Sequence, residues 1–185
     1  VGVLEAYAIF NKDKLLTFNS TAQGSQKWVQ INQFKETTKA IKVLKQKGFK
    51  LYGTNLSSDS IDYRKCDFKG STAFVLGAEK WGISEAAASL MDEHIHIPMR
   101  GMVESLNVSV AASTLLFEAL RQRQVANILP EEGEGMKQET YKEKIFEWAY
   151  PEVAKWCKSE GKKYPQLNAK GEIIDHIPRS LKMKY

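Results

Sequence analysis

Two short apolar runs, each followed by a loop and then by a helix-like pattern, most constrain how this chain can fold. The runs are residues 73–76 and 95–97, and the loops that follow contain glycine or proline. The repeated order of strand, loop and helix is typical of a parallel α/β sheet. Ligands of such sheets bind where loops leave the carboxyl ends of strands. The sequence therefore predicts that loops 77–82 and 100–107 form two walls of one small-molecule site.

The first third of the chain contains a further predicted strand whose carboxyl end could contribute to the same site. Residues 3–10 are almost entirely apolar and predict a buried strand. Residues 36–47 predict an amphipathic helix that ends at Gly48, with an apolar face formed by Ala40, Ile41 and Leu44. The next predicted strand, 49–53, ends at Thr54. This threonine is a candidate third wall of the pocket, and the alternative is a turn threonine that satisfies its own backbone.

Two further segments carry apolar side chains at helical spacing. Residues 83–91 and 108–120 both predict helices whose apolar residues form core rather than chemistry. The second segment is apolar over a broad face. It can therefore pack on a sheet and still offer a stripe to a second subunit. Residues 58–70, between the predicted strands, read as a polar connection in which Cys66 is an inert, partly buried thiol.

The composition shifts after the second of these helices. We divide the chain into a domain of residues 1–123 and a helical C-terminal extension of residues 124–185. Residues 130–135 (PEEGEG) predict a linker. Residues 141–148 and 152–159 predict two short helices, broken at the Tyr-Pro pair between them.

Charge and cysteine content narrow the functional class only a little. A net charge of +5 over 185 residues permits an anionic partner without proving one. The two cysteines, Cys66 and Cys157, give neither zinc-ligand spacing nor a disulfide framework, which favours a reducing, cytoplasmic compartment. No apolar run reaches transmembrane length and no signal peptide is present, so we expect no membrane partner. The first residue is Val1 rather than Met, so we expect the natural chain to begin earlier.

The two loops also carry a family resemblance. Residues 77–82 read G-x-E-x-x-G, residues 97–101 read I-P-M-x-G, and residues 105–111 read S-L-N-V-S-x-A. In this order they resemble the SpoU branch of the SPOUT methyltransferases. The resemblance implies a mostly parallel α/β sheet with helices on both faces and a deep C-terminal trefoil knot. It also implies a homodimer that binds S-adenosyl-L-methionine, needs no metal and methylates a ribose 2′-hydroxyl of RNA.

Two more segments resemble the tRNA-specific subgroup of that branch. Residues 22–29 read A-x-G-S-x-x-W-V, and residues 146–173 continue the likeness through the basic, aromatic tail, so that it covers essentially the whole chain. The resemblance implies methylation of guanosine 18 in the tRNA D-loop. The RNA-binding residues that we expect are Ser25, Lys27, Lys155 and Lys162, because basic residues near aromatic ones suit RNA contact. The alternatives are an ordinary surface loop and a solvated pair of amphipathic helices.

The resemblance also assigns cofactor-binding residues. It implies that main-chain groups of Leu76, Ile97 and Leu106 bind the adenine edge, and that Gly77 and Gly101 allow a close approach of the backbone. Thr54 and Met99 complete the expected cofactor site. From the sequence alone, the apolar members of this set can equally be ordinary core residues.

Three polar positions match active-site positions of the family, namely Glu79, Ser105 and Asn107. Capping of the following helix is the alternative role for Ser105 and Asn107, since both residue types are favoured N-caps. The family's proposed catalytic arginine, in an N-x-x-A-x-x-R motif, precedes the position equivalent to Val1 and is not among these 185 residues. The polypeptide is therefore either shortened at its N-terminus or catalytically incomplete.

Other functions fit the sequence less well. His94 and His96 alternate along one strand, but no third ligand at convincing spacing supports a metal site. A G-x-S-x-G elbow of hydrolases is absent, and loop 77–82 lacks the G-K-[ST] ending of a phosphate loop. A ribosomal-RNA methyltransferase of the same branch remains an alternative, as does a non-catalytic RNA-binding protein that keeps the cofactor pocket.

Overall fold

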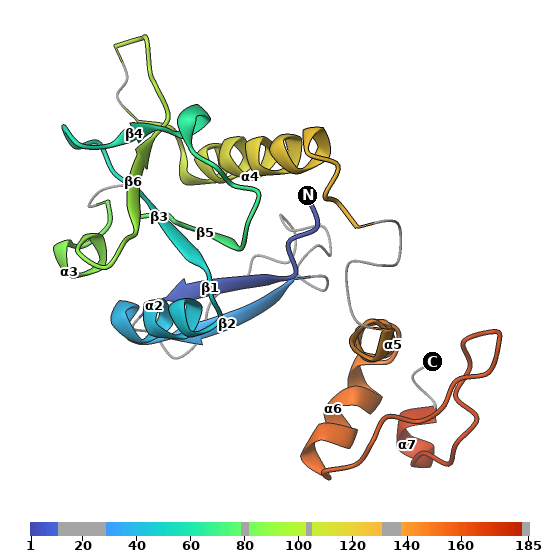
Figure 1. Cartoon of the computed structure of the whole chain (residues 1–185). Coiled ribbons are helices and arrows are strands. Elements are labelled where there is room, and N and C mark those ends of the chain that lie inside the picture. The colour runs from blue at the N-terminus through green and yellow to red at the C-terminus, as the bar shows by residue number, and fades with distance from the viewer. Residues whose placement is uncertain (11–28, 79–81, 103–104, 131–137, 183–185) are drawn as a thin grey trace. The chain divides into compact units, whose positions relative to one another are not determined.

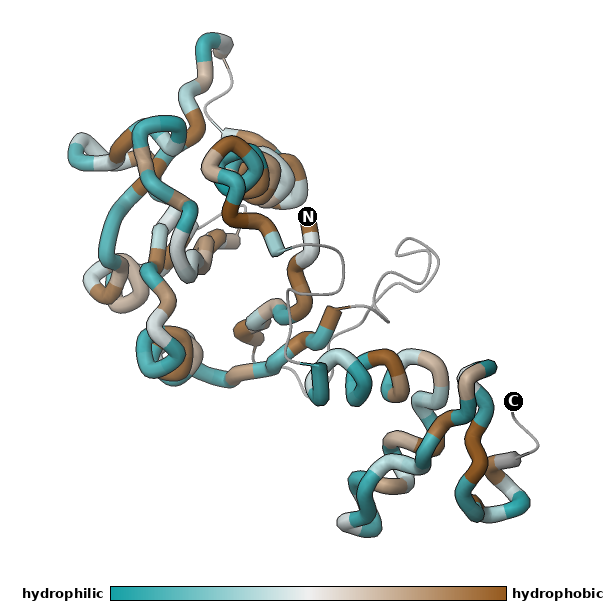
Figure 2. The backbone as a smooth tube through the Cα atoms, turned by 45° about the vertical axis from the view of Figure 1, so that its right-hand side comes forward, coloured by the Kyte–Doolittle hydropathy of each residue, from teal (hydrophilic) through white to brown (hydrophobic). Residues whose placement is uncertain are grey.

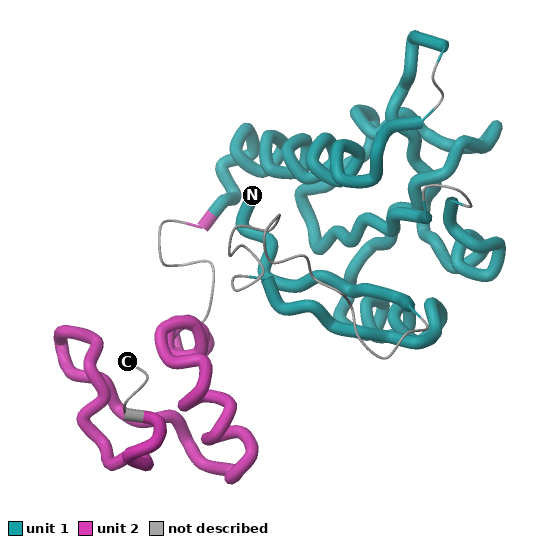
Figure 3. The backbone as a smooth tube through the Cα atoms, turned by 180° about the vertical axis from the view of Figure 1, so that it is seen from behind, with its two compact units in different colours: residues 1–129 teal, residues 130–185 magenta. Residues whose placement is uncertain are grey.

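The protein consists of two compact units, residues 1–129 and residues 130–185 (Figure 3). The structure is a computed structural model, and it describes residues 1–10, 29–78, 82–102, 105–130 and 138–182. Unit 1 contains the strands and the helices α2 to α4, and unit 2 contains the helices α5 to α7. Unit 1 encloses two clusters of buried apolar side chains, and unit 2 encloses one.

A parallel sheet forms the centre of unit 1. Its strands are β3 (Lys50–Thr54), β4 (Ile61–Asp62), β5 (Thr72–Val75) and β6 (Glu93–His96), and they lie in the order β4-β6-β3-β5. All three pairings are parallel. The prediction of a parallel sheet is thus confirmed, and the carboxyl ends of these strands meet at one edge.

Helices cover both faces of this sheet, as predicted (Figure 1). Adjacent residues of β3 point to opposite faces because side chains alternate along a strand. Leu51 packs in one cluster with residues of α2 (Thr37–Gln46) and α3 (Glu85–Ala88). Tyr52 packs in the other cluster, which includes Leu115 and Ala119 of α4 (Val108–Val125). The apolar face predicted for α2 is also confirmed, since Ala40, Ile41 and Leu44 are buried.

The last turn of α4 is attached to the connection that precedes β5. Gln122 donates from Nε2 to the carbonyl of Cys66 at 2.9 Å and accepts the N–H of Phe68 at 2.8 Å. Arg123 donates to the carbonyls of Phe68 and Gly70 at 3.2 and 2.9 Å. Burial raises the pKa of the Cys66 thiol to about 11, so this residue stays a neutral thiol at physiological pH.

The connection 58–70 holds more structure than its polar composition predicted. It contains β4 and a 3₁₀ turn over Tyr63–Lys65, and the side chain of Phe68 is fully buried. Phe68 packs edge-on against Tyr52 and Phe74, with ring centroids 4.9 Å apart in both pairs. The aromatic residues of this connection thus contribute to the core under α4.

A second parallel sheet pairs β1 (Glu5–Ile9) with β2 (Gln30–Phe34). The strand near the N-terminus was predicted, but the prediction that it is buried was wrong. Ile9 is 42% exposed, and none of the five residues of β1 is buried. Only Tyr7 packs against the cluster around α2, because β1 belongs to a two-stranded sheet rather than to the centre of the larger one. The polar strand β2 was not predicted.

Helix α3 is much shorter than the segment 83–91 that the apolar spacing predicted. It begins after Ser84, whose Oγ accepts the N–H of Ala87 at 3.3 Å, and it ends at Ser89. Ala87 is buried, and Leu90 and Met91 pack beside it without being helical. Apolar spacing therefore identified Ala87, Leu90 and Met91 correctly, but it was wrong for Ala86, which is exposed, and it overestimated the length of the helix.

Unit 2 is built from α5 (Gln138–Ala149), α6 (Pro151–Ser159) and α7 (Arg179–Lys182). The predicted break between the first two helices is confirmed, with proline in the first turn of α6. Apolar and polar stretches alternate along these helices (Figure 2). Their apolar sides enclose a core formed by Phe146, Val153, Ala154, Cys157 and Ile177.

A polar cluster adjoins this core. The carboxylate of Glu147 accepts hydrogen bonds from Lys144 and Tyr164 and pairs with Lys158 at 2.8 Å. Burial opposes its ionisation, but these donors outweigh burial and lower the pKa of Glu147 to about 2. The cluster thus joins α5, α6 and the segment that follows them. Of the helices that the structure describes, none combines the length and apolar character needed to cross a membrane.

Candidate active site

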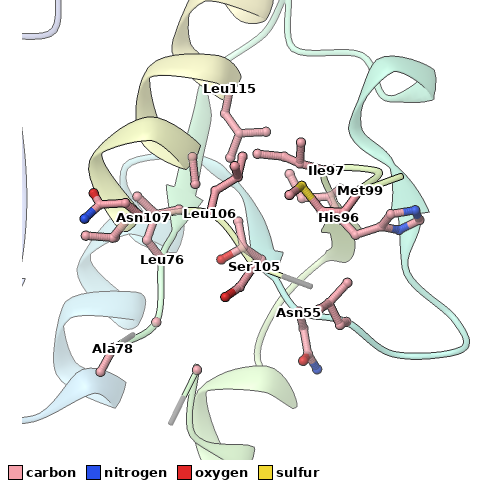
Figure 4. A pocket seen from close by; sticks show the side chains of 17 residues that line it. Asn55, Leu76, Ala78, His96, Ile97, Met99, Ser105, Leu106, Asn107 and Leu115 are labelled. Atoms are coloured by element: carbon pink, nitrogen blue, oxygen red, sulfur yellow. The ribbon is translucent and has the colours of Figure 1, made fainter. Parts of the chain in front are cut away.

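A cavity of about 510 Å³ opens where the central strands of unit 1 end (Figure 4). Its volume lies within the roughly 300–1,000 Å³ of small-molecule sites. The residues that line it come from the ends of β3, β5 and β6 and from the start of α4. They are Thr54, Asn55, Leu56, Leu76, Gly77, Ala78, Gly82, Ile95, His96, Ile97, Met99, Ser105, Leu106, Asn107, Val108, Ala111 and Leu115. The two loops expected to form one site therefore do meet.

The loop after β5 turns back on itself between two glycines. Ala78 and Gly82 exchange backbone hydrogen bonds of 3.0 and 2.8 Å. A Cβ added at Gly77 would lie 2.0 Å from the carbonyl carbon of Gly82, so the closeness of the two backbones requires glycine at 77. Gly82 has a φ of 63°, a conformation that favours glycine. Glu79, the expected polar residue of this loop, lies outside the described residues.

The neighbouring strand ends supply an apolar wall. Leu76 and Ile97 line the cavity and also pack against the core that contains Tyr52 and Leu115. Thr54 donates from Oγ1 to the carbonyl of Val75 at 3.2 Å and so ties the end of β3 to β5. Its hydroxyl thus bonds to the backbone of a neighbouring strand rather than to its own backbone, and the residue also lines the cavity. Binding of adenine by main-chain groups in this wall stays a prediction.

The third part of the lining is the entrance to α4. Asn107 is the N-cap of the helix, and its Oδ1 accepts the N–H of Ser109 at 2.9 Å. The capping role that the sequence left open for Asn107 is thus confirmed. Ser105 is exposed and lies near the centre of the lining residues, between Leu106 and Asn55 (Figure 4). Both predicted polar residues of this loop are therefore at the cavity.

Other expected site residues lie elsewhere. Gly101 does not line the cavity, and a Cβ added to it would meet no atom within 4 Å, so this structure gives no steric reason for glycine there. Lys155 and Lys162 belong to unit 2. Lys162 lies over the Trp156 ring, with its Nζ 4.5 Å from the ring centroid. Ser25 and Lys27 lie outside the described residues.

Sequence reasoning did not single out nine of the lining residues, namely Asn55, Leu56, Ala78, Gly82, Ile95, His96, Val108, Ala111 and Leu115. Asn55 and Leu56 directly follow a predicted strand end, and Ala78 lies inside a loop already assigned to the site. Their positions in the sequence could therefore have identified these three residues as lining residues. His96 was weighed only as a metal ligand, together with His94. Within the described ranges, no group of three His, Cys, Asp or Glu residues is placed to hold a metal ion.

The fold and the cavity together define a parallel α/β protein with a cavity of small-molecule size at the carboxyl ends of its strands. Residues 5–117 match the model of the SpoU rRNA methylase family, and residues 121–176 match the model of its C-terminal part. The chain belongs to the SpoU methylase family. The resemblance carried by the loop motifs is thus confirmed.

Its relatives include enzymes that act on two kinds of RNA. The chain is 40% identical over 173 residues to the tRNA (guanosine(18)-2′-O)-methyltransferase of Escherichia coli. The alignment covers 94% of this chain and 76% of the relative. The enzyme of the same name from Thermus thermophilus is 45% identical over 148 residues, in an alignment that covers 80% of this chain and 75% of that enzyme. The 23S rRNA (guanosine-2′-O-)-methyltransferase RlmB of Ralstonia nicotianae is 39% identical over 118 residues, only 62% and 47% of the two chains.

Solved structures agree with these sequence matches. The Aquifex aeolicus TrmH/SpoU tRNA modifying enzyme superposes with a TM-score of 0.75 and 34% identity, over 82% of this chain and 77% of that one. The SpoU methyltransferase AviRb of Streptomyces viridochromogenes, solved in complex with AdoMet, gives a TM-score of 0.60 and 26% identity over 67% and 51% of the chains.

The close approach at Gly77 can be tested by adding one methyl group. We expect Gly77→Ala to lower the free energy of unfolding by about 1–3 kcal/mol, because the loop must shift to admit the Cβ. Gly70→Ala is the matched control, since a Cβ there meets no atom within 4 Å and should change stability by less than about 0.5 kcal/mol. Urea denaturation measures both variants. Equal stabilities of the two would contradict the assigned role of Gly77.

Proposed function

We propose that this protein is an S-adenosyl-L-methionine-dependent ribose 2′-O-methyltransferase that acts on guanosine 18 of cytoplasmic tRNA. The proposal rests on one observation: both units of this chain align with a tRNA methyltransferase. The tRNA relative from Escherichia coli aligns with 94% of the chain, whereas the ribosomal-RNA relative aligns with 62%. Unit 2, with its local basic patches and aromatic residues, is therefore part of what the chain shares with this tRNA enzyme.

The cavity suits a nucleoside cofactor. It combines apolar walls from Leu76, Ile97 and Leu106 with polar side chains at Thr54 and Ser105. We assign adenine binding to main-chain groups of Leu76, Ile97 and Leu106, and we assign the remaining contacts to Thr54, Gly77 and Met99. Bound S-adenosyl-L-methionine would supply the electrophilic methyl group and the leaving group. The protein then has to hold the ribose hydroxyl in line with that methyl group, and positioning of this kind can supply much of a rate enhancement.

The polar residues at the mouth of the cavity would orient the RNA. We assign this role to Ser105 and Asn107, which both line the cavity at the entrance to α4, and to Glu79. The catalytic arginine that the family implies is not among these 185 residues. The described residues therefore bind and orient, and removal of the hydroxyl proton is assigned to none of them.

We infer the trefoil knot that is expected of this family. Strand β6 lies between β4 and β3, although it follows both of them in sequence, and this strand order is compatible with a knot. Knots are rare in proteins, and membership of the family is what supports the inference. A crystal structure in which the backbone forms no knot would overturn the inference.

The proposed reaction has a direct test. Full-length protein, labelled S-adenosyl-L-methionine and unmodified tRNA should yield label on the 2′-oxygen of guanosine 18, mapped by nuclease digestion and mass spectrometry. A tRNA that already carries the 2′-O-methyl group at this position is the control and should accept no label. Label in ribosomal RNA instead would support the alternative substrate. Cofactor binding without transfer to either RNA would support a non-catalytic RNA-binding protein.

The two roles of Asn107 can be separated by paired substitutions. Asn107→Ser keeps an N-cap oxygen and removes the amide, so the free energy of unfolding should change by less than about 0.5 kcal/mol. Turnover should nevertheless fall about tenfold to hundredfold, as when one polar active-site group is removed. Asn107→Ala should lose the same activity and, in addition, about 1 kcal/mol of stability. If Asn107→Ser keeps full turnover, the residue only caps the helix.

Unit 2 is the part that we assign to the tRNA backbone, through Lys155 and Lys162. Lys155 is exposed on α6, and Lys162 is held over Trp156. Replacing Lys155 with Ala should reduce the slope of log Kd for tRNA against log salt by about one, since one phosphate contact is lost. Lys170→Ala, in the turn between Leu167 and Ile173, is the control. The idea fails if both variants show the wild-type slope. By the resemblance, Ser25 and Lys27 would share this role.

We further infer that two copies associate through the outer face of α4. Val110 and Phe117 lie two turns apart on this helix and are 50% and 63% exposed. Apolar side chains on one exposed face favour a protein partner. Phe117→Asp should shift the protein from dimer to monomer in sedimentation velocity, whereas Ile174→Asp, at an equally exposed apolar residue of unit 2, should not. A wild-type monomer at all concentrations would refute the dimer.

A further inference from the structure

One wall of the cavity is a loop whose shape depends on a side-chain pair with no role so far. Residues 55–60 connect β3 to β4, and Asn55 and Leu56 at the start of this loop line the cavity. At its other end, Ser60 Oγ lies 2.9 Å from His96 Nδ1 of β6. The same hydroxyl donates to the carbonyl of Ser57 at 2.8 Å, and the Ser60 N–H donates to that carbonyl at 3.1 Å.

Both ends of the loop are attached to β6. The N–H of Asn55 donates to the carbonyl of Ile95 at 3.1 Å, and Ile61, which follows the loop, pairs with the same Ile95. Leu56, between these points, is 62% exposed, so it is weakly held by packing. The hydrogen bonds from Ser60 to the Ser57 carbonyl therefore shape the part of the loop that directly follows the lining residues Asn55 and Leu56.

The hydrogen-bond directions follow from the chemistry of the groups. A carbonyl oxygen can only accept, so the single proton of the Ser60 hydroxyl is directed at Ser57. The hydroxyl must then accept from His96, which requires the proton of the imidazole to be on Nδ1. His96 Nδ1, Ser60 Oγ and the Ser57 carbonyl thus form a continuous chain of donor and acceptor from the sheet to the loop.

We propose that Ser60 and His96 are positioning residues that hold loop 55–60 in the shape that accepts the cofactor. The proposal rests on the proposed function and extends it to residues that no part of the reaction has yet used. A loop without this pair populates the accepting shape only part of the time. The apparent Kd then rises in inverse proportion to the populated fraction. Once the cofactor is bound, the loop is already in place, so transfer at saturating cofactor is unchanged.

The measurement is binding of S-adenosyl-L-homocysteine, the reaction product, to full-length protein by isothermal titration calorimetry. Ser60→Ala should raise its Kd about three- to tenfold, the effect of losing one hydrogen bond. It should raise the KM for S-adenosyl-L-methionine by a similar factor while kcat changes less than about twofold. Ser58→Ala is the matched control, because that exposed hydroxyl of the same loop bonds only to Asp59 in the described structure, and its Kd should equal that of the wild type.

Substitutions at His96 distinguish positioning from packing. The side-chain amide of His96→Asn can place an N–H near the position of Nδ1, so this variant should keep a Kd within about twofold of the wild type. His96→Leu retains apolar bulk without a donor and should raise the Kd as Ser60→Ala does. The double variant Ser60→Ala/His96→Leu should show no further increase, since both changes break one connection.

The outcomes separate this inference from the proposed function. Wild-type protein that does not bind S-adenosyl-L-homocysteine would overturn both. Wild-type binding with an unchanged Kd for Ser60→Ala would overturn the positioning role alone. Additive increases in the double variant, or a loss of kcat equal to the rise in KM, would also overturn it.

Discussion

The pairing of β6 between β3 and β4 is the constraint on which the site depends. Because these strands are parallel, their carboxyl ends meet at one edge, and the loops that leave them are forced together. The cavity then needs no separate domain to close it, since α4 begins at the same edge and packs its apolar face on the sheet. The order of the strands thus decides both the place of the site and which residues line it.

Several residues that line the cavity also have a structural role. Gly77 is fixed by the backbone of Gly82, and Asn107 caps α4 while lying at the cavity. Thr54 ties two strand ends and also lines the cavity. At Thr54 and Asn107 the side chain that makes a backbone hydrogen bond therefore belongs to a residue that also lines the cavity.

Several features could be predicted from the sequence because residues close together in the chain determine them. The apolar face of α2, the end of that helix at Gly48, which has a φ of 79°, and the break before Pro151 all follow from residues close together in sequence. Other features could not be predicted from the sequence. Strand β2 is polar and exists through its pairing with β1, and Leu90 and Met91 pack like helical residues although α3 has ended. In both cases contacts distant in sequence override the local pattern.

The sequence by itself determined the parallel α/β class, the two loops, 77–82 and 100–107, that meet at the cavity, and the family. It could do so because strand, loop and helix signals and motif residues are local in sequence. Only the tertiary structure decided that β6 lies between β3 and β4, that Asn55, Leu56 and His96 belong to the cavity, and that Ser60 reaches His96 across 36 residues. The reason is physical: which strand pairs with which depends on the free energy of the whole packed unit, and no short stretch of residues carries that information.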